Sequence, residues 1–317
     1  MSSVPTSTDH GHRYRHEAFF YADDDEFFDG TLAFLREAVA SREPTLVVLS
    51  ARKNEILQRR FNPDSDEVLF ADMAEVGSNP ARIIPAWHDF LARYSGPSRR
   101  LRGIGEPIWA GRSEAETAEC QRHEALLNVA FADPSFWLLC PYDTSALPES
   151  VIDEARRTHP FVSHAHGSAP SATYPGGDAF AVPSDEPLSQ PTSAAVLSFG
   201  DRQLRDVRRF VADQCVIAGV RGARSDEAVL AVNELATNSL LYGGGSGTLR
   251  VWTEAGVLIF EVQDRGCIGD PLVGRQRPAL NSPGGRGLWI VNQVCDLVQV
   301  RQFGLVNVVR VHIRIDS

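Results

Sequence analysis

The segment AVLAVNELATNSLL, residues 228–241, determines how the C-terminal part of this chain folds. Apolar residues recur in it at helical intervals, which predicts one amphipathic helix. Glu234 and Asn238 are four residues apart, so this helix places a carboxylate and a carboxamide on one face. Ser225 and Asp226 precede the apolar pattern and are expected to cap the start of the helix.

The role of Glu234 and Asn238 depends on two later segments. They are VQDRGCIGD at residues 262–270 and GGRGLWIV at residues 284–291. The other expected elements are a helix at 200–216, strands at 248–252 and 257–263, a helix at about 287–298 and a strand at 309–315. The last strand alternates apolar and polar residues, as half-buried antiparallel strands do. Helices on one side of a mixed sheet predict an α/β sandwich over residues 194–317.

These segments offer a candidate partner for each part of a magnesium-bound nucleoside triphosphate. Asn238 presents a neutral carbonyl oxygen to a Mg²⁺ ion that phosphates and water otherwise coordinate. Asp264, at a strand end, can accept a hydrogen bond from the adenine amine, and Gly266 lets the backbone come close. Glu234 lies one helical turn from Asn238, where it could deprotonate a hydroxyl nucleophile.

The loop before the expected helix at 287–298 has the composition of a phosphate-binding loop. Gly284, Gly285 and Gly287 remove side-chain bulk where the helix begins, so backbone amides can face phosphate oxygens there. The arginines that could neutralise the remaining charge are Arg275, Arg277 and Arg286.

Together, the three segments resemble the boxes of the Bergerat-type (GHKL, histidine-kinase-like) ATP-binding domain, in the branch that includes anti-sigma serine kinases. The matching residues are Glu234 and Asn238 in NELATN, Asp264 and Gly266 in QDRG, and Gly285, Gly287 and Leu288 in GGRGLWIVNQVCD. The resemblance implies ATP and Mg²⁺ as cofactors, with Asn238 as the metal ligand and Glu234 as the catalytic base.

Two positions depart from that family pattern. Ile268 stands where the second box usually has a glycine, and Gly269 follows it. The last strand carries Asn307-Val308-Val309 where relatives often have threonines near the adenine. We therefore expect a less polar base pocket and a reduced affinity for nucleotide.

The region before this domain is a linker without a histidine-bearing hairpin, which disfavours a sensor histidine kinase.

Strands and helices alternate through the N-terminal half. Apolar strands at 18–21, 45–50, 67–71, 100–105 and 136–140 are separated by expected helices at 26–40, 54–60, 80–94 and 114–132, and another helix follows at 150–157. This order predicts a mostly parallel sheet covered on both faces. The segment SARKNE after the second strand is not a glycine-rich lysine loop, which disfavours phosphate binding there.

The N-terminal half also resembles a known family, the MEDS sensory domain of methanogen and methylotroph regulators, which is often fused to regulatory modules in actinobacteria. The resemblance rests on NPARIIPAWHDFL, RGIGEPIWAGRS, ECQRHEALLN and WLLCPYDTSALP, and covers residues 15–162. It implies a RecA-like α/β sensor fold without ATPase machinery. It transfers no ligand site, so the signal is an unknown small molecule.

Polar residues in this half allow two interpretations. Glu106, His123 and Glu124 form either a polar pocket floor or salt-bridged groups that pack a helix onto a strand. Cys120 and His123 lie one helical turn apart and could ligate a metal with Cys140, although a fourth ligand is not recognisable.

Three further histidines lie at the end of this domain. We expect His159, His164 and His166 to be solvated.

Composition bounds the rest of the chain. It has 317 residues, 43% of them apolar, enough for two domains, and its net charge of −10 argues against direct nucleic-acid binding. We expect residues 1–14 to be disordered and residues 163–193, rich in proline, serine and glycine, to be a linker.

The five cysteines lack close pairs and are expected to be reduced. Without a signal sequence or membrane span, a cytoplasmic protein is expected.

Two functions follow as hypotheses. One is a sensory regulator of the anti-sigma type that uses ATP and Mg²⁺ to phosphorylate a serine or threonine of an antagonist protein, or that sequesters a sigma factor. The alternative is a non-catalytic module that binds ATP or docks a partner under the control of the sensor. The sequence leaves the oligomeric state open, a homodimer included.

Overall fold

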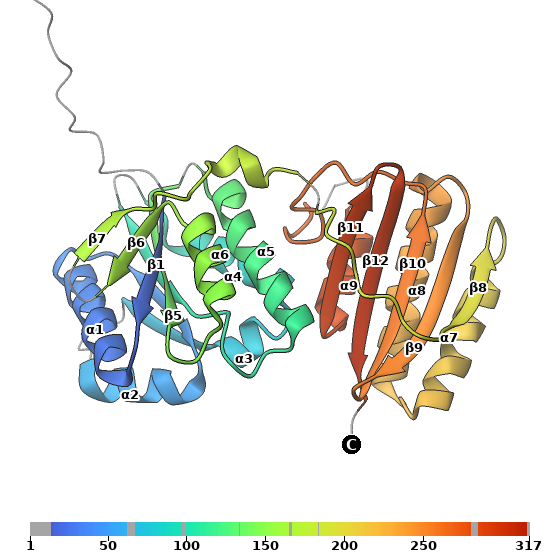
Figure 1. The fold of residues 1–317 in the computed structure, drawn as a ribbon, viewed down its shortest axis with the longest axis horizontal. Coiled ribbons are helices and arrows are strands. Elements are labelled where there is room, and N and C mark those ends of the chain that lie inside the picture. Colours follow the sequence, from blue (N-terminus) through green and yellow to red (C-terminus); the bar gives the residue numbers. More distant parts are fainter. Residues whose placement is uncertain are drawn as a thin grey trace, which may run out of the picture. The chain divides into compact units, whose positions relative to one another are not determined.

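The protein is described by a computed structural model covering residues 14–61, 67–96, 99–132, 134–164, 167–182, 184–279 and 285–315. It contains two compact units (Figure 1). The first comprises Met1–Gly77 and Ala86–Phe180, and the second comprises Ser78–Pro85 and Ala181–Ser317. Among the described residues, none of the helices combines the length and hydrophobicity that crossing a bilayer requires.

The first unit is built on a seven-stranded sheet in the order β3-β2-β4-β5-β1-β6-β7, parallel except where β6 meets β7. Its strands are β1 (Arg15–Tyr21), β2 (Thr45–Leu49), β3 (Val68–Asp72), β4 (Leu101–Gly105), β5 (Phe136–Asp143), β6 (Phe161–His164) and β7 (Gly167–Pro170). Its helical segments, in chain order, are α1 (Asp24–Ala40), α2 (Ala51–Phe61), α3 (Met73–Val76), α4 (Ile83–Tyr94), α5 (Glu114–Ala130), α6 (Glu149–Thr158) and η2 (Gly177–Phe180), whereas η1 (Pro80–Arg82) falls in the second unit. The mostly parallel α/β sheet predicted from the sequence is present.

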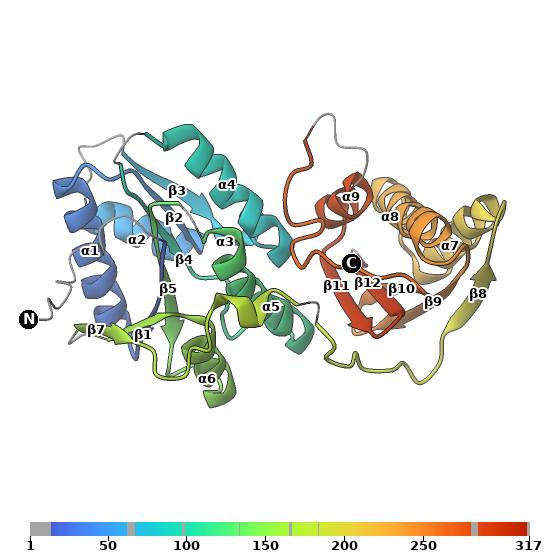
Figure 2. The same ribbon diagram turned by 90° about the horizontal axis from the view of Figure 1, so that it is seen from above.

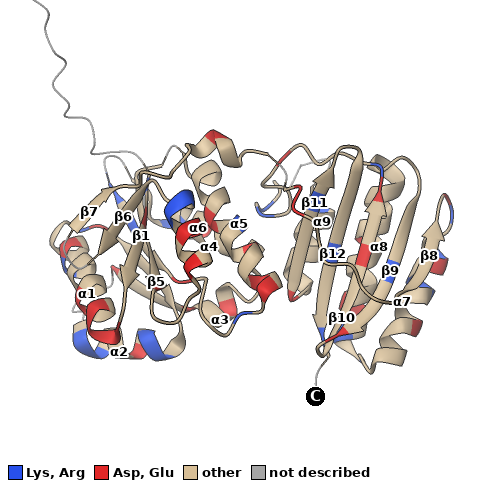
Figure 3. Ribbon diagram, viewed as in Figure 1, with Lys and Arg blue, Asp and Glu red and all other residues tan. Residues whose placement is uncertain are grey.

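Local sequence explains where the main helices of this unit begin. Asp23 caps α1, because its carboxylate accepts the backbone N–H of Glu26 at 2.9 Å. The acidic residues that follow, coloured red at α1 in Figure 3, favour the positive end of the helix. Ser113 and Glu116 form a capping box at the start of α5.

Helices cover both faces of the sheet. Phe27 and Leu35 of α1, with Leu57 of α2, pack in one buried cluster with alternate residues of the strands. On the opposite face, Trp87 of α4 lies over β4, where a Cβ on Gly103 would come within 2.9 Å of its ring. Glycine in β4 therefore makes room for the tryptophan.

The second unit is an antiparallel sheet in the order β11-β12-β10-β9-β8, with its helices on one face (Figure 2). Its elements are β8 (Ala195–Phe199), α7 (Leu204–Ala218), α8 (Ala223–Tyr242), β9 (Gly247–Glu254), β10 (Val257–Asp264), α9 (Arg286–Val294), β11 (Leu297–Phe303) and β12 (Val306–Arg314). The predicted α/β sandwich is therefore present, and its core lies between the sheet and the inner faces of α7, α8 and α9.

Element boundaries in this unit differ from the predictions at several points. Helix α8 begins after Gly222, which offers no side-chain cap, instead of at Ser225 and Asp226. Strand β8 was not predicted, and the helix expected to continue to 298 ends at Val294 because β11 begins at Leu297. The register that makes β11 a strand comes from pairing with β12, which is a tertiary contact.

The described residues of the predicted linker, 163–193, include the end of β6, strand β7 and the short helix η2, and the rest of them have no regular secondary structure. Its first part completes β6 and forms β7, which extend the sheet of the first unit. In its last part, the backbone carbonyls of Glu186 and Ser189 accept hydrogen bonds from Arg301 and Arg310 of the second sheet. Strand pairing and hydrogen bonds from arginine to backbone carbonyls need few apolar side chains, so composition does not indicate them.

Candidate nucleotide site

The second unit contains a cavity of about 270 Å³ between α8, β10, α9 and β12. Its lining combines apolar side chains, which suit the face of a base, with a few polar groups. The predicted site residues in that lining are Asn238, Asp264, Gly266, Gly285, Gly287 and Leu288. The structure therefore brings all three sequence segments to one cavity.

The first turn of α9 packs directly against α8. A Cβ built on Gly287 would lie 3.1 Å from Glu234 Oε2 and 3.2 Å from Asn238 Nδ2. A larger residue at this position would require Glu234 or Asn238 to shift, so glycine favours the observed approach of α9 to these two side chains. Glu234 borders this contact and is half-buried, but it does not line the cavity itself.

Asp264 is held by a hydrogen-bond network at the end of β10. Its Oδ2 accepts the Ser239 hydroxyl at 2.6 Å, and its Oδ1 accepts the Gly266 backbone N–H at 2.9 Å. Asn307 of β12 also donates to Oδ1 at 3.4 Å, while the carbonyl oxygen of its own side chain is buried without a partner. The cavity thus holds a fixed carboxylate and an unsatisfied acceptor, which fits a ligand with a donor amine such as adenine.

Sequence reasoning did not assign Ser239 and Asn307 to the site. Asn307 was noted only as a departure from the family pattern. In the sheet it pairs with Asp264, because β10 and β12 run antiparallel. That register was the signal that could have identified it.

The end of α8 is equally close to Asp264. A Cβ on Gly243 would lie 2.5 Å from Asp264 Cγ, and the carbonyl of Gly243 accepts the N–H of Arg265 at 3.0 Å. Gly243 has an ordinary negative φ of −99°, so the constraint here is space alone.

The loop before α9 is anchored onto that helix. Asn292 donates to the carbonyl of Gly274 at 2.9 Å, and a Cβ on Gly274 would lie 2.8 Å from Leu288 Cγ. Gly285 caps α9 in the left-handed conformation, with φ of 85°. The unsatisfied amides at the start of α9 therefore lie where the cavity is lined by Gly285 and Gly287.

None of the three predicted arginines is among the described residues that line the cavity. Arg275 is buried, Arg277 is exposed with its guanidinium 5.9 Å from the Trp289 ring, and Arg286 is exposed at the first position of α9. Gly284 lies outside the described residues.

In the first unit, Glu106 lies beyond the carboxyl end of β4 in a compact network. Lys53 Nζ contacts its two carboxylate oxygens at 2.6 and 2.8 Å, and the Tyr21 hydroxyl donates to it at 2.7 Å. Burial raises the pKa of Glu106, against the opposing charge of Lys53. Glu106 is thus salt-bridged, as one of the two interpretations expected.

The histidines and cysteines of this unit are arranged differently from the prediction. His159 is fully buried instead of solvated, whereas His164 is exposed and His166 lies outside the described residues. The thiol of Cys120 donates to the carbonyl of Pro107 at 3.3 Å. Spacing along α5 suggested Cys120, but the sheet decides which side chains face Cys140.

The cluster that does include Cys140 joins it to His16, Glu124 and His159. Burial lowers the pKa of His16 to about 4, and the neighbouring His159 adds to this effect.

Two family models match the chain, one over most of each unit. Residues 197–313 match the family model described as "Histidine kinase-like ATPase domain", and residues 15–160 match the model described as "MEDS: MEthanogen/methylotroph, DcmR Sensory domain". The chain is therefore a MEDS domain fused to a histidine kinase-like ATPase domain.

Other comparisons are more distant. Among solved structures, the chain is similar to the Acinetobacter baumannii histidine kinase AdeS at 12% identity and a TM-score of 0.24, over 39% of this chain and 70% of that one. No curated protein gives a significant match to the sequence.

Gly243 provides a test of the packing around Asp264. Gly243→Ala introduces a methyl group into the space of the Asp264 carboxylate, so we expect a loss of about 1–3 kcal/mol in the free energy of unfolding. Thermal or denaturant unfolding of the full chain measures it. Gly269→Ala is the matched control, because a Cβ there meets no atom within 4 Å. Equal stabilities of the two variants would contradict the described packing.

Proposed function

We propose that the second unit binds ATP with Mg²⁺ and transfers the terminal phosphoryl group to a serine or threonine of a partner protein, under control of the MEDS unit. The observation that carries this proposal is the contact of Gly287 with Glu234 and Asn238, which places a carboxylate and a carboxamide at the glycine-bordered start of a helix. The histidine kinase-like ATPase domain supports ATP as the nucleotide.

Asp264 and Asn307 are suited to the base. A carboxylate oxygen of Asp264 accepts a hydrogen bond from the adenine amine, and Ser239 and Gly266 hold that carboxylate in place. The buried carbonyl oxygen of Asn307 provides a second acceptor. Val262, Val309 and the other apolar residues of the cavity face the ring.

The phosphates are assigned to the other end of the cavity. Backbone amides at the start of α9 donate to phosphate oxygens, since these amides lack intrahelical partners and the helix dipole favours an anion. Asn238 would hold Mg²⁺ through its carbonyl oxygen, and the ion would supply positive charge to the phosphates.

Glu234 is assigned the role of general base. Its carboxylate takes the proton of the incoming serine or threonine hydroxyl while the oxygen forms a bond to the terminal phosphorus and ADP leaves. The anti-sigma resemblance supports a sigma factor or its antagonist as the partner.

One observation favours a second function, a non-catalytic nucleotide-binding or docking module. Glu234 does not line the cavity, and none of the three predicted arginines does so among the described lining residues. A site of this kind could bind ATP without stabilising the charge that develops during transfer.

Asn238 is the first test. Asn238→Ala removes the carboxamide oxygen assigned to Mg²⁺, so the affinity for ATP should fall about tenfold in the presence of Mg²⁺. Calorimetric titration of the full chain, with and without Mg²⁺, measures this. Identical affinities for wild type and variant would remove Asn238 from the metal site.

Glu234 separates the two functions. Glu234→Gln should abolish transfer of labelled phosphate to serine or threonine of a co-purifying partner while ATP still binds, because only the base is lost. Asp226→Asn, an exposed acidic position on the same helix, is the control and should leave transfer unchanged. ATP binding without any transfer by the wild-type chain would instead support the docking module.

Cys267 reports directly on occupancy of the cavity. It lines the cavity and is the exposed one of the five cysteines, all of which are described. A thiol reagent should therefore label Cys267 first, and ATP with Mg²⁺ should slow that labelling. Cys267→Ser should lose the fast-labelling phase, which mass spectrometry can check. Labelling that is indifferent to ATP would place the nucleotide elsewhere.

A further inference from the structure

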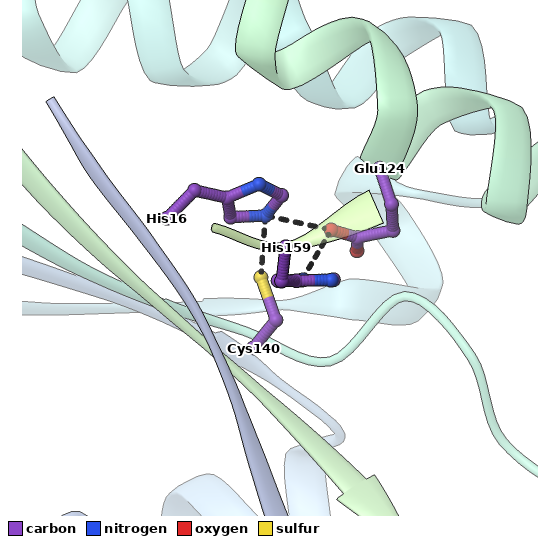
Figure 4. A group of neighbouring side chains, drawn as sticks. All are labelled: His16, Glu124, Cys140 and His159. Carbon is purple, nitrogen blue, oxygen red and sulfur yellow. Dashed lines mark hydrogen bonds and ion pairs between the residues drawn. The ribbon is translucent and has the colours of Figure 1, made fainter. Parts of the chain in front are cut away.

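Four potential metal ligands meet in the interior of the first unit, whereas the candidate nucleotide cavity belongs to the second. They are His16 on β1, Glu124 on α5, Cys140 on β5 and His159, which follows α6 directly. Figure 4 shows their side chains converging on one point. The four ligand atoms all lie within 4.8 Å of one another, and each residue is 1% exposed or less.

The spacing fits a single small cation. His16 Nε2 lies 3.0 Å from Glu124 Oε2 and 3.4 Å from Cys140 Sγ, and His159 Nε2 lies 3.3 Å from the same carboxylate oxygen. Tetrahedral zinc bound by nitrogen, oxygen and sulfur holds its ligand atoms about 3.3–3.8 Å apart. Small side-chain movements would therefore complete the coordination.

The outer nitrogens of both histidines are already committed to acceptors. His16 Nδ1 lies 3.2 Å from the carbonyl oxygen of the Asn128 side chain, and His159 Nδ1 lies 2.8 Å from the carbonyl oxygen of Ala155. A carbonyl oxygen only accepts, so each Nδ1 carries a proton, and when the rings are neutral each Nε2 presents a lone pair inward. Metal-binding histidines typically donate the N–H of their other ring nitrogen to an acceptor in this way.

The centre of the cluster is therefore short of donors. Two Nε2 lone pairs and the Glu124 carboxylate face one another, and only the Cys140 thiol can supply a proton there. His159 Nε2 and Glu124 Oε1 are buried without a hydrogen-bond partner. Buried acceptors without donors are costly, and a cation would satisfy all of them at once.

We propose that His16, Glu124, Cys140 and His159 bind one zinc-class divalent metal ion as a closed structural site of the MEDS unit. The set of two nitrogens, one sulfur and one oxygen suits zinc, whereas Mg²⁺ and Ca²⁺ require oxygen ligands. Binding displaces the proton of the Cys140 thiol to solvent. A divalent ion with one thiolate, one carboxylate and two neutral imidazoles is uncharged overall, so burying the complex is tolerable.

The site joins distant parts of the unit. Its ligands come from two adjacent strands of the sheet and from α5 and the end of α6, so the bound ion ties both ends of the domain sequence together. With every ligand buried, a substrate has no access to Cys140, which distinguishes the cluster from a cysteine–histidine catalytic pair.

Metal content and cobalt spectroscopy of the full chain test this proposal. We expect about one zinc per chain as isolated, and we expect Co²⁺ added to metal-depleted protein to give a thiolate-to-cobalt charge-transfer band with tetrahedral d–d bands. Zinc should raise the melting temperature of the depleted chain by about 5 °C or more.

Substitutions locate the site. Cys140→Ala should lose the charge-transfer band and most of the bound metal. His159→Asn should also lose the metal, although it keeps Cys120 and Cys140. Cys120→Ala is the matched control, because Cys120 is a buried cysteine of the same unit outside the cluster, and it should keep both signals.

Variants that do not fold leave the decision to the wild-type chain. No bound metal and no thiolate–cobalt band in that chain would overturn the proposal, as would a band that survives in folded Cys140→Ala. The cluster would then be an ion-paired group of core residues. Both outcomes are independent of ATP binding.

Discussion

The second unit depends on one close approach, the packing of the first turn of α9 onto α8 at Gly287. Because that residue has no side chain, the backbone of α9 comes within contact distance of Glu234 and Asn238. The same approach leaves the cavity open between the start of α9 and Asp264. The roles proposed for Glu234 and Asn238 rest on that geometry.

The opposite side of the cavity is fixed by different means. Gly243 lets the end of α8 approach Asp264. Three groups then donate hydrogen bonds to the Asp264 carboxylate: the Ser239 hydroxyl, the Gly266 backbone N–H and the Asn307 side-chain amide. An acidic group held in this way cannot rotate freely, so its orientation is set before a ligand arrives. The two glycines therefore act as spacers for two polar clusters.

The first unit also brings buried polar side chains together from different elements of the fold. Its sheet places His16 and Cys140 on neighbouring strands, and α5 supplies Glu124. Glu106, in contrast, is fully engaged by Lys53 and Tyr21. The two carboxylates differ in their partners: Glu106 contacts a lysine, whereas Glu124 contacts two histidine nitrogens.

Sequence alone determined the periodic elements, the two domain types and the boxes that line the cavity, because local spacing fixes helix faces and strand ends. It did not place Asn307 beside Asp264, end α9 before β11 or join His159 to His16. Those arrangements depend on strand register and on which faces of distant elements meet. Likewise, the composition of residues 163–193 does not indicate strand β7 or the hydrogen bonds that Arg301 and Arg310 donate to the backbone of this stretch. Only the tertiary structure decides such contacts, since they join residues whose separation in sequence carries no periodic signal.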